Sequence, residues 1–385
     1  MTSKQLYIRI LLLLIGIRII MVIGITQGFP HIHDKGWFIY IVDWYEKEFF
    51  RLAKSLAEFH PIISLSCLGY PLFLVTFIWI FKASVIEDIL LSVVLFNSIL
   101  LFGISIFLVA AIAKKLSNEN KKVALLSAGL WVILPYLVHL AVLFNPHLAC
   151  LDIAQKRTSY LMWTTFVDDP LFTFLVMLGV YTFVLSSKYK DKIFYSILVG
   201  SFFGFAALIN PLTSVVIGIS FITAFLFMKR IRSFIYAAIT FVMFGIPQLI
   251  YNWYFNGSPF KLLSLGSDRN LFFNGRLIPL FSLSNILFFI NRIKARFDIV
   301  TLFFIIIFVL MVVLSIIYIL IKRREAKILI IWIAPYLLFV FSYSRSYYSI
   351  LELTVTILPA TIIMFSLILV DTFDYLLVKY KYESH

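Results

Sequence analysis

Acidic residues are scarce in this sequence, and two groups of them lie at the edges of long apolar runs. The chain has 19 Asp and Glu residues among 385. Asp34 follows the first apolar run in the stretch Pro30-His-Ile-His-Asp-Lys-Gly-Trp37, and Asp168 and Asp169 come directly before a later run. A carboxylate within reach of a hydroxyl nucleophile can take its proton, which is general-base catalysis. These acids are therefore the first candidates for a catalytic site.

Both groups also have a structural interpretation. Asp169 followed by Pro170 is typical of an N-cap and a first helical residue, and taken alone this interpretation is favoured for the acid pair. His31 and His33 beside Asp34 are residue types that bind metals. Two histidines and one acid form an incomplete site, so hydrogen-bonding histidines are favoured. The metal requirement stays open, with a divalent metal as an option and no certain cofactor.

Arginines near the same outer loops would suit a phosphate ligand. The guanidinium group is a planar fork that matches phosphate oxygens. Arg345 lies between the last two apolar runs and is the first candidate, with an ion pair to Glu352 as the structural alternative. Arg18 lies inside the first apolar run, where pairing with an acid and snorkelling are both open, and it is assigned no role. Further basic candidates are Lys156, Arg157, Arg269 and Arg276.

The elements that must position these residues are membrane-spanning helices. Hydrophobic residues make up 62% of the chain and charged residues 14%, with a mean hydropathy of +1.01. Soluble domains have about 25% charged residues. This composition therefore excludes a soluble enzyme, a disordered chain and a soluble nucleic-acid-binding protein. The net charge of +14 reflects basic cytoplasmic loops rather than a nucleic-acid partner.

The apolar runs predict an all-α polytopic membrane protein with about ten transmembrane helices. Short basic connectors separate the runs, and placing all of these connectors in the cytoplasm also places both termini there. This topology requires run 62–82, which Gly69, Tyr70 and Pro71 interrupt, to enter the membrane without crossing it. The expected spans are 7–28, 86–113, 122–145, 169–187, 193–209, 211–228, 233–252, 298–321, 328–342 and 350–373.

Three outer regions are informative: 29–85, 146–168 and 253–297. Within the first, residues 37–59 place apolar side chains at spacings of three and four with charges on the opposite stripe, which predicts an interfacial amphipathic helix. Residues 285–297 repeat this pattern, and simple packing beside the spans is an equal alternative for both segments. We divide the chain into a catalytic transmembrane core, 1–252, and a part with an outer loop and C-terminal spans, 253–385.

Three short stretches occur in a fixed order along this topology: Gly69-Tyr-Pro-Leu-Phe73, Pro247-Gln-Leu-Ile-Tyr-Asn-Trp-Tyr-Phe-Asn-Gly-Ser-Pro259 and Ser344-Arg-Ser-Tyr-Tyr348. With the two outer acid groups, this order resembles the GT-C superfamily of membrane glycosyltransferases, which includes the dolichyl-phosphate-mannose protein mannosyltransferases. The stretches are similar to that family's Tyr-Pro-Leu segment, its Pro…Tyr-Asn…Phe-Gly-Ser-Pro stretch and its outer Arg-Tyr motif, with Asn256 inserted before the glycine of the second. The resemblance spans residues 5–370 and depends on order and spacing.

The resemblance implies a hexosyltransferase that moves a sugar, with inversion, from a polyprenyl-phosphate-linked donor to an acceptor protein, lipid or glycan on the outer membrane face. It implies a first catalytic acid at Asp34, with Asp43 as a competitor because the family's acid-x-x-x-Tyr pattern is not clean here. It implies a second acid at Asp169 or Asp168. It also implies that the arginines above hold the donor phosphate.

Two other functional classes stay open. A transporter or flippase for a lipid-linked substrate would have internal pseudo-symmetry and ionisable groups near the middle of the membrane. The sequence has no detectable repeat, and its outer acids cluster on one side, which favours the enzyme. A non-catalytic membrane subunit would keep the architecture without needing the acids. Each class predicts a multi-pass protein of the cell membrane, in contact with the lipid bilayer and without a nucleic-acid partner.

Overall fold

The computed structural model describes residues 3–27, 44–62, 67–144, 163, 168–189, 193–257, 272–273, 276–277, 299–343 and 356–383. Within these ranges the secondary structure is helical apart from β1 (Phe272–Phe273) and β2 (Arg276–Leu277), which pair antiparallel. This confirms the prediction of an all-α chain. The helices are α1 (Ser3–Gln27), α2 (Trp44–Ala57), α3 (Gly69–Phe81), α4 (Glu87–Leu95), the π-helix η1 (Phe96–Leu101), α5 (Phe102–Leu116), α6 (Lys121–Phe144), α9 (Asp169–Lys188), α10 (Ile193–Ile209), α11 (Pro211–Phe227), α12 (Ile231–Asn256), α14 (Ile299–Lys322), the short 3₁₀ helix η2 (Arg324–Ala326), α15 (Lys327–Tyr343) and α17 (Leu358–Glu383).

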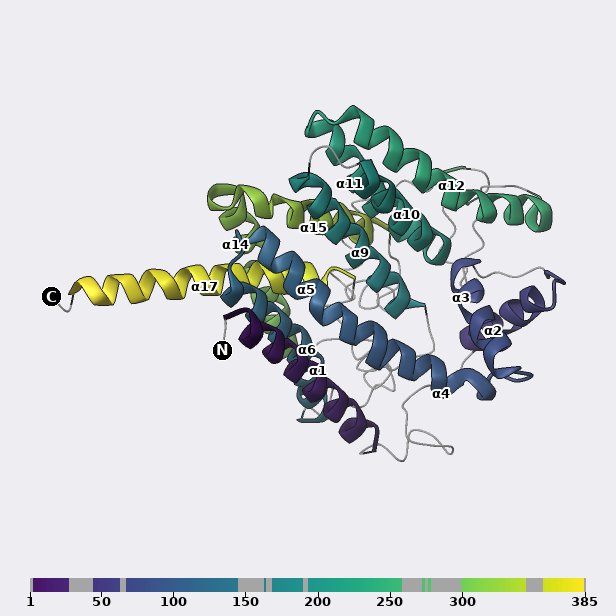
Figure 1. Ribbon diagram of the computed structural model, residues 1–385, viewed down its shortest axis with the longest axis horizontal. Coiled ribbons are helices and arrows are strands. Elements are labelled where there is room, and N and C mark those ends of the chain that lie inside the picture. The colour runs from purple at the N-terminus through teal and green to yellow at the C-terminus, as the bar shows by residue number, and fades with distance from the viewer. Residues whose placement is uncertain are drawn as a thin grey trace.

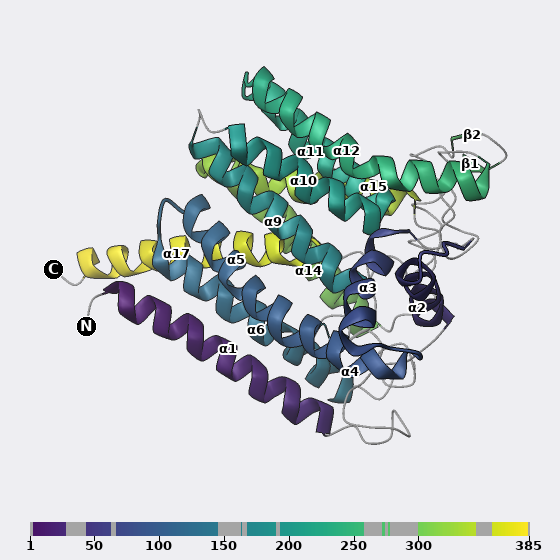
Figure 2. The same ribbon diagram turned by 45° about the vertical axis from the view of Figure 1, so that its right-hand side comes forward.

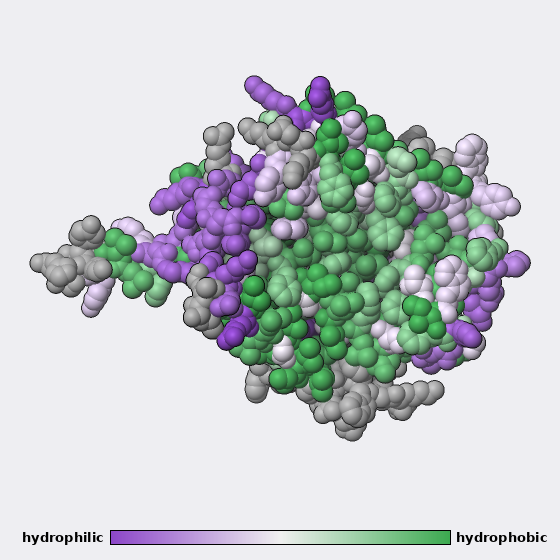
Figure 3. All heavy atoms as spheres, in the orientation of Figure 1, coloured by the Kyte–Doolittle hydropathy of each residue, from purple (hydrophilic) through white to green (hydrophobic). Residues whose placement is uncertain are grey.

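The surface and the long apolar helices of the molecule are typical of a membrane protein (Figure 3). Figure 3 shows hydrophobic side chains across the middle of the visible face and hydrophilic side chains gathered toward its two ends. Helices occupy each range in which a span was expected, but several of them, such as α10 with 17 residues, are short. The count of ten spans therefore stays a prediction. Within the described residues, five helices are long and apolar enough to cross a membrane: Lys4–Ile23, Glu87–Leu116, Asp169–Lys188, Ile231–Phe255 and Leu358–Val378.

Basic connectors that are far apart in the sequence meet at one end of the helical bundle. Glu119, between α5 and α6, pairs with Lys115 at 2.6 Å and with Lys188 at the end of α9 at 3.2 Å. The hydrophilic side chains near the projecting part of α17 in Figure 3 belong to this end. We term it the basic end. Its other cross-connections are Lys122–Asp374, Arg323–Asp371 and a hydrogen bond from Arg230 to the carbonyl oxygen of Ser187.

Helices α2 and α3 lie together at the opposite end, which we term the α2 end (Figure 2). The structure describes the expected amphipathic helix as α2, which begins at Trp44; residues 37–43 and 285–297 lie outside the described ranges. Helix α3 has 13 residues, about 20 Å, whereas a hydrocarbon core is about 30 Å thick. Tyr70 packs on Phe49 of α2, and Trp79 donates to the carbonyl oxygen of Ala57. Both halves of α3 thus contact α2, and the expectation that this segment does not cross the membrane stays a prediction.

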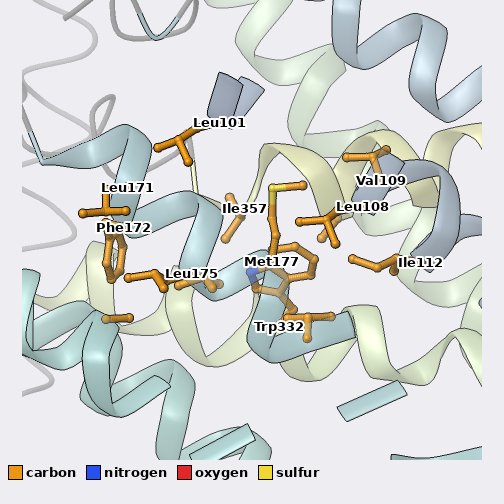
Figure 4. Close-up of a cluster of buried hydrophobic side chains, with 14 of the residues drawn as sticks. Leu101, Leu108, Val109, Ile112, Leu171, Phe172, Leu175, Met177, Trp332 and Ile357 are labelled. Carbon is orange, nitrogen blue, oxygen red and sulfur yellow. The ribbon is translucent and has the colours of Figure 1, made fainter. Parts of the chain in front are cut away.

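The core between the two ends is packed from aliphatic and aromatic side chains. In Figure 4, Leu108 of α5, Met177 of α9 and Trp332 of α15 meet in one cluster. The contact between α10 and α12 depends on glycine: a Cβ added to Gly200 of α10 would lie 2.2 Å from the carbonyl oxygen of Ala237 on α12. Gly200 and Gly204 form a Gly-x-x-x-Gly pair, which is typical of close helix packing in membranes. This contact positions α12, whose last turns reach the α2 end.

Candidate active site

The two acids before the fourth expected span lie at the α2 end. Helix α9 begins at Asp169 and runs for 20 residues to Lys188 at the basic end, about 30 Å away. Among the predicted site residues, Asp168 and Asp169 are the two whose side chains the structure describes. For Arg276 it describes the backbone, in β2. The remaining predicted site residues lie outside the described ranges: His31, His33, Asp34, Asp43, Lys156, Arg157, Arg269 and Arg345.

The interpretation of Asp169 as an N-cap needs correction. Because α9 already begins at Asp169, the cap residue is Asp168, which has helical dihedral angles (φ −76°, ψ −19°) and makes no side-chain capping hydrogen bond. Pro170 lies in the first turn, where its missing N–H removes no intrahelical bond. The N–H of Phe172 donates to the carbonyl oxygen of Asp168 at 2.9 Å. A side-chain cap therefore does not account for two acids at this position.

The charge of Asp169 acts on a buried tyrosine from a distant part of the chain. This residue, Tyr336 of α15, has no exposed surface, and its hydroxyl shares a hydrogen bond with the hydroxyl of Thr356, just before α17. Hydroxyls both donate and accept hydrogen bonds, and carboxylates accept them. The carboxylate of Asp169 is therefore the group at this position that could accept a hydrogen bond from a sugar or acceptor hydroxyl, whereas Tyr336 and Thr356 are buried and hydrogen-bonded to each other.

Thr173 adds a polar group that the sequence analysis missed. It lies four residues after Asp169, so the two side chains share one face of α9. Thr173 is fully buried, and its hydroxyl has no hydrogen-bond partner within the described parts of the chain. By contrast, the hydroxyl of Thr182 on the same helix donates to the carbonyl oxygen of Leu178 at 2.9 Å. A single threonine in an apolar helix carries no sequence signal that could have identified it.

Arg18, which received no role from the sequence, is buried among aromatic side chains. Its guanidinium carbon lies 3.8 Å from the centre of the Phe102 ring, and its Nη1 donates to the hydroxyl of Tyr136 at 2.6 Å. Phe102 also stacks on Trp131 and meets the edge of Trp163. Ionisable groups inside membrane spans commonly mark functional regions. Because α9 contacts η1, and Phe102 directly follows η1, this cluster borders the first part of α9.

The stretch that begins at Pro247 contacts the residues just before the stretch that begins at Gly69. The Oε1 of Gln248 on α12 accepts a hydrogen bond at 2.8 Å from the N–H of Leu68, directly before Gly69. The hydroxyl of Tyr251 donates to the carbonyl oxygen of Ile62 at 2.6 Å. Gly69 lies so close to the end of α10 that a Cβ would meet a backbone atom at 2.7 Å. These contacts hold the start of α3, and with it α2, against α12 (Figure 2).

Helix α2 contributes a further acid, Glu48. This residue is buried, and Arg51 donates to both of its carboxylate oxygens, at 2.8 and 2.7 Å. Both carboxylate oxygens of Glu48 are therefore occupied by Arg51, which gives Glu48 a structural role in α2.

Within the described ranges, no group of three or more His, Cys, Asp or Glu residues is placed to hold a metal ion. The histidines proposed as metal ligands lie outside those ranges, so the metal option stays open.

Comparisons with protein-family models, curated proteins and solved structures gave no match to this chain. The resemblance to the GT-C superfamily accordingly stays a prediction from short motifs, and the function has to be argued from the residues themselves.

Proposed function

We propose that this protein is a membrane glycosyltransferase that moves a sugar from a polyprenyl-phosphate-linked donor to an acceptor hydroxyl. The observation that carries the proposal is the position of Asp169, at the first residue of α9 and at the end of the bundle opposite to the basic end. Under the positive-inside rule, this end of the bundle is the outer end. A lipid-linked donor presents its sugar at such a boundary while its tail stays in the bilayer.

In the proposed reaction, the acceptor hydroxyl attacks the anomeric carbon of the sugar. The bond between that carbon and the phosphate oxygen breaks, and polyprenyl phosphate leaves with the bonding electrons. The hydroxyl proton passes to a carboxylate base, and this single displacement inverts the anomeric centre. Negative charge near an oxocarbenium-like centre lowers the barrier, as in glycoside hydrolysis.

The proposed roles divide between two acids and a set of arginines. Asp34 is the base, with Asp43 as its competitor, and Asp169 orients the acceptor or the sugar with Asp168 as its substitute. Arg345 holds the donor phosphate through its planar fork, helped by an arginine of the 253–297 region. Thr173, on the same face of α9 as Asp169, supplies a hydroxyl within the same region.

The test measures sugar transfer from a panel of radiolabelled polyprenyl-phosphate sugars to a membrane extract, with the purified chain in lipid vesicles. Asp34→Asn should lower turnover by ~10²–10⁴-fold, the usual cost of removing a general base, and Asp169→Asn should also lower turnover. The matched control is Asp374→Asn at the basic end, where the carboxylate forms an exposed ion pair with Lys122. The proposal fails if the folded wild-type chain transfers no sugar, or if Asp169→Asn and Asp374→Asn transfer at the same rate.

The same vesicles separate the two other functional classes. Movement of the lipid-linked donor across the bilayer without transfer would instead support a transporter or flippase. Neither transfer nor movement of the donor would support a non-catalytic subunit.

A further inference from the structure

The basic end carries more positive charge than its own acids neutralise. Glu119, Asp371 and Asp374 are each already in an ion pair there. Glu325, between α14 and α15, is the other acid at this end whose side chain the structure describes. Five exposed cations at the same end have no ion-pair partner within the described ranges: Lys4, Lys229, Arg232, Lys322 and Lys327.

At two turns, these surplus cations alternate with exposed apolar side chains. Between α11 and α12, Phe227 is 89% exposed and is followed by Lys229 and Arg232. Between α14 and α15, Ile321 is 75% exposed and precedes Lys322. Helix α11 packs on α15, and the end of α11 and the start of α15 both belong to the basic end. Figure 3 shows hydrophilic side chains along this edge of the molecule.

The α11–α12 turn is held firmly although its side chains are exposed. The guanidinium group of Arg230 donates to the carbonyl oxygen of Ser187, which ties the turn to the end of α9. Lys229 has φ 56°, a left-handed conformation that glycine adopts at lower cost after a helix. The backbone therefore places a lysine at the tip of the turn despite this cost. Cations on a rigid turn lose little conformational entropy when they bind a ligand.

We propose that the α11–α12 and α14–α15 turns bind the headgroups of anionic phospholipids in the adjacent membrane leaflet. Cations close to a bilayer attract anionic headgroups over about one Debye length. Apolar side chains next to those cations fit at the boundary between headgroups and acyl chains. A second copy of the chain is a poorer partner, because it would place the same surplus of positive charge against itself. This inference does not depend on the proposed sugar transfer.

The test titrates phosphatidylglycerol or phosphatidylcholine into the full-length chain in neutral detergent and follows the unfolding temperature, which rises when a ligand binds the folded state. The double substitution Lys229→Gln with Arg232→Gln removes two cations from the turn. The matched control, Lys47→Gln with Lys82→Gln, removes two exposed cations from the α2 end. We expect phosphatidylglycerol, and not phosphatidylcholine, to stabilise the wild type and the control. The half-saturating concentration should be about thirtyfold higher for the Lys229 and Arg232 variant, which lacks two cations.

Three results would overturn the inference. The first is an equal response of both double variants to phosphatidylglycerol. The second is an equal stabilisation of the wild type by phosphatidylcholine. The third is the same stabilisation by inorganic phosphate at equal concentration, which would make a free anion the ligand. Unfolding temperatures without lipid verify that both variants are folded, and the single substitution Arg232→Gln, on an exposed side chain, gives a second reading of the same effect.

Discussion

Replacing Gly200 by alanine should force α10 and α12 apart. An added Cβ would lie 2.0 Å from the hydroxyl oxygen of Thr240 and 2.2 Å from the carbonyl oxygen of Ala237. The threonine side chain can rotate, but it then loses its hydrogen bond to the carbonyl oxygen of Ile197 at 3.3 Å. The Ala237 oxygen belongs to the helix backbone and cannot move alone. Helix α12 therefore has to retreat by about 1 Å to reach ordinary van der Waals contact.

The expected loss of stability follows from two opposing effects. Overpacking a close contact costs about 1–3 kcal/mol, whereas alanine gains up to about 1 kcal/mol over glycine in a helix. Gly200→Ala should therefore lower the free energy of unfolding by about 1–2 kcal/mol. At Gly204 an added Cβ would lie 2.9 Å from the carbonyl oxygen of Phe241, on the same interface. The double variant should lose less than the sum of the two, because one retreat of α12 relieves both contacts.

The assay is reversible unfolding in mixed micelles, followed by tryptophan fluorescence. Gly129→Ala on α6 is the matched control, because an added Cβ there meets no atom within 4 Å. This control should be neutral or slightly stabilising. Equal stability of Gly200→Ala and Gly129→Ala would refute the claim that the close backbone contact holds α10 against α12.

Three further predictions use the same assay. Hydrogen bonds from Lys115 and two other lysines lower the pKa of Glu119 from 4.5 to about 2. Glu119 therefore stabilises the fold above about pH 4.5 and loses this contribution as the pH falls toward 2. Glu119→Gln should reduce the loss of unfolding free energy between pH 4.5 and 2 by about 1 kcal/mol. The effect is small because the Glu119 side chain is 41% exposed and solvent screens its ion pairs. An unchanged pH profile would contradict this. Arg18→Lys should cost about 1–2 kcal/mol, because an ammonium group lacks the planar stack on the aromatic ring, and wild-type stability would argue against that packing. Gln248→Leu should cost about 1–3 kcal/mol by leaving the N–H of Leu68 without its acceptor, and unchanged amide exchange at Leu68 would show that this bond does not hold the loop.

The chain by itself determines where its helices are and which connectors share an end. Long apolar runs must become helices because lipid offers no hydrogen bonds to the backbone, and the structure has helices in each expected range. The basic connectors were expected on one side, and ion pairs such as Glu119–Lys188 join them at one end. The amphipathic period likewise predicted a helix where α2 forms, with Phe49 and Leu52 buried, whereas Phe59 of the same stripe lies beyond the end of α2 and is 81% exposed. Asp169 and Lys188 lie at the two ends of one predicted helix. The sequence therefore also predicts that Asp169 lies at the end of the bundle opposite to the basic connectors.

Which side chains meet was decided by the tertiary structure. The sequence offered an N-cap role for Asp169, but not its proximity to Tyr336, which lies on a helix more than 160 residues later. From the sequence, Arg18 could pair with an acid or extend to the membrane surface. In the structure its guanidinium group instead lies on the Phe102 ring and donates to the hydroxyl of Tyr136. Periodicity indicates which face of a helix is apolar, but not how that helix is rotated or which neighbour it meets. Those depend on close contacts such as Gly200 against α12, where a single Cβ would change the distance between helices.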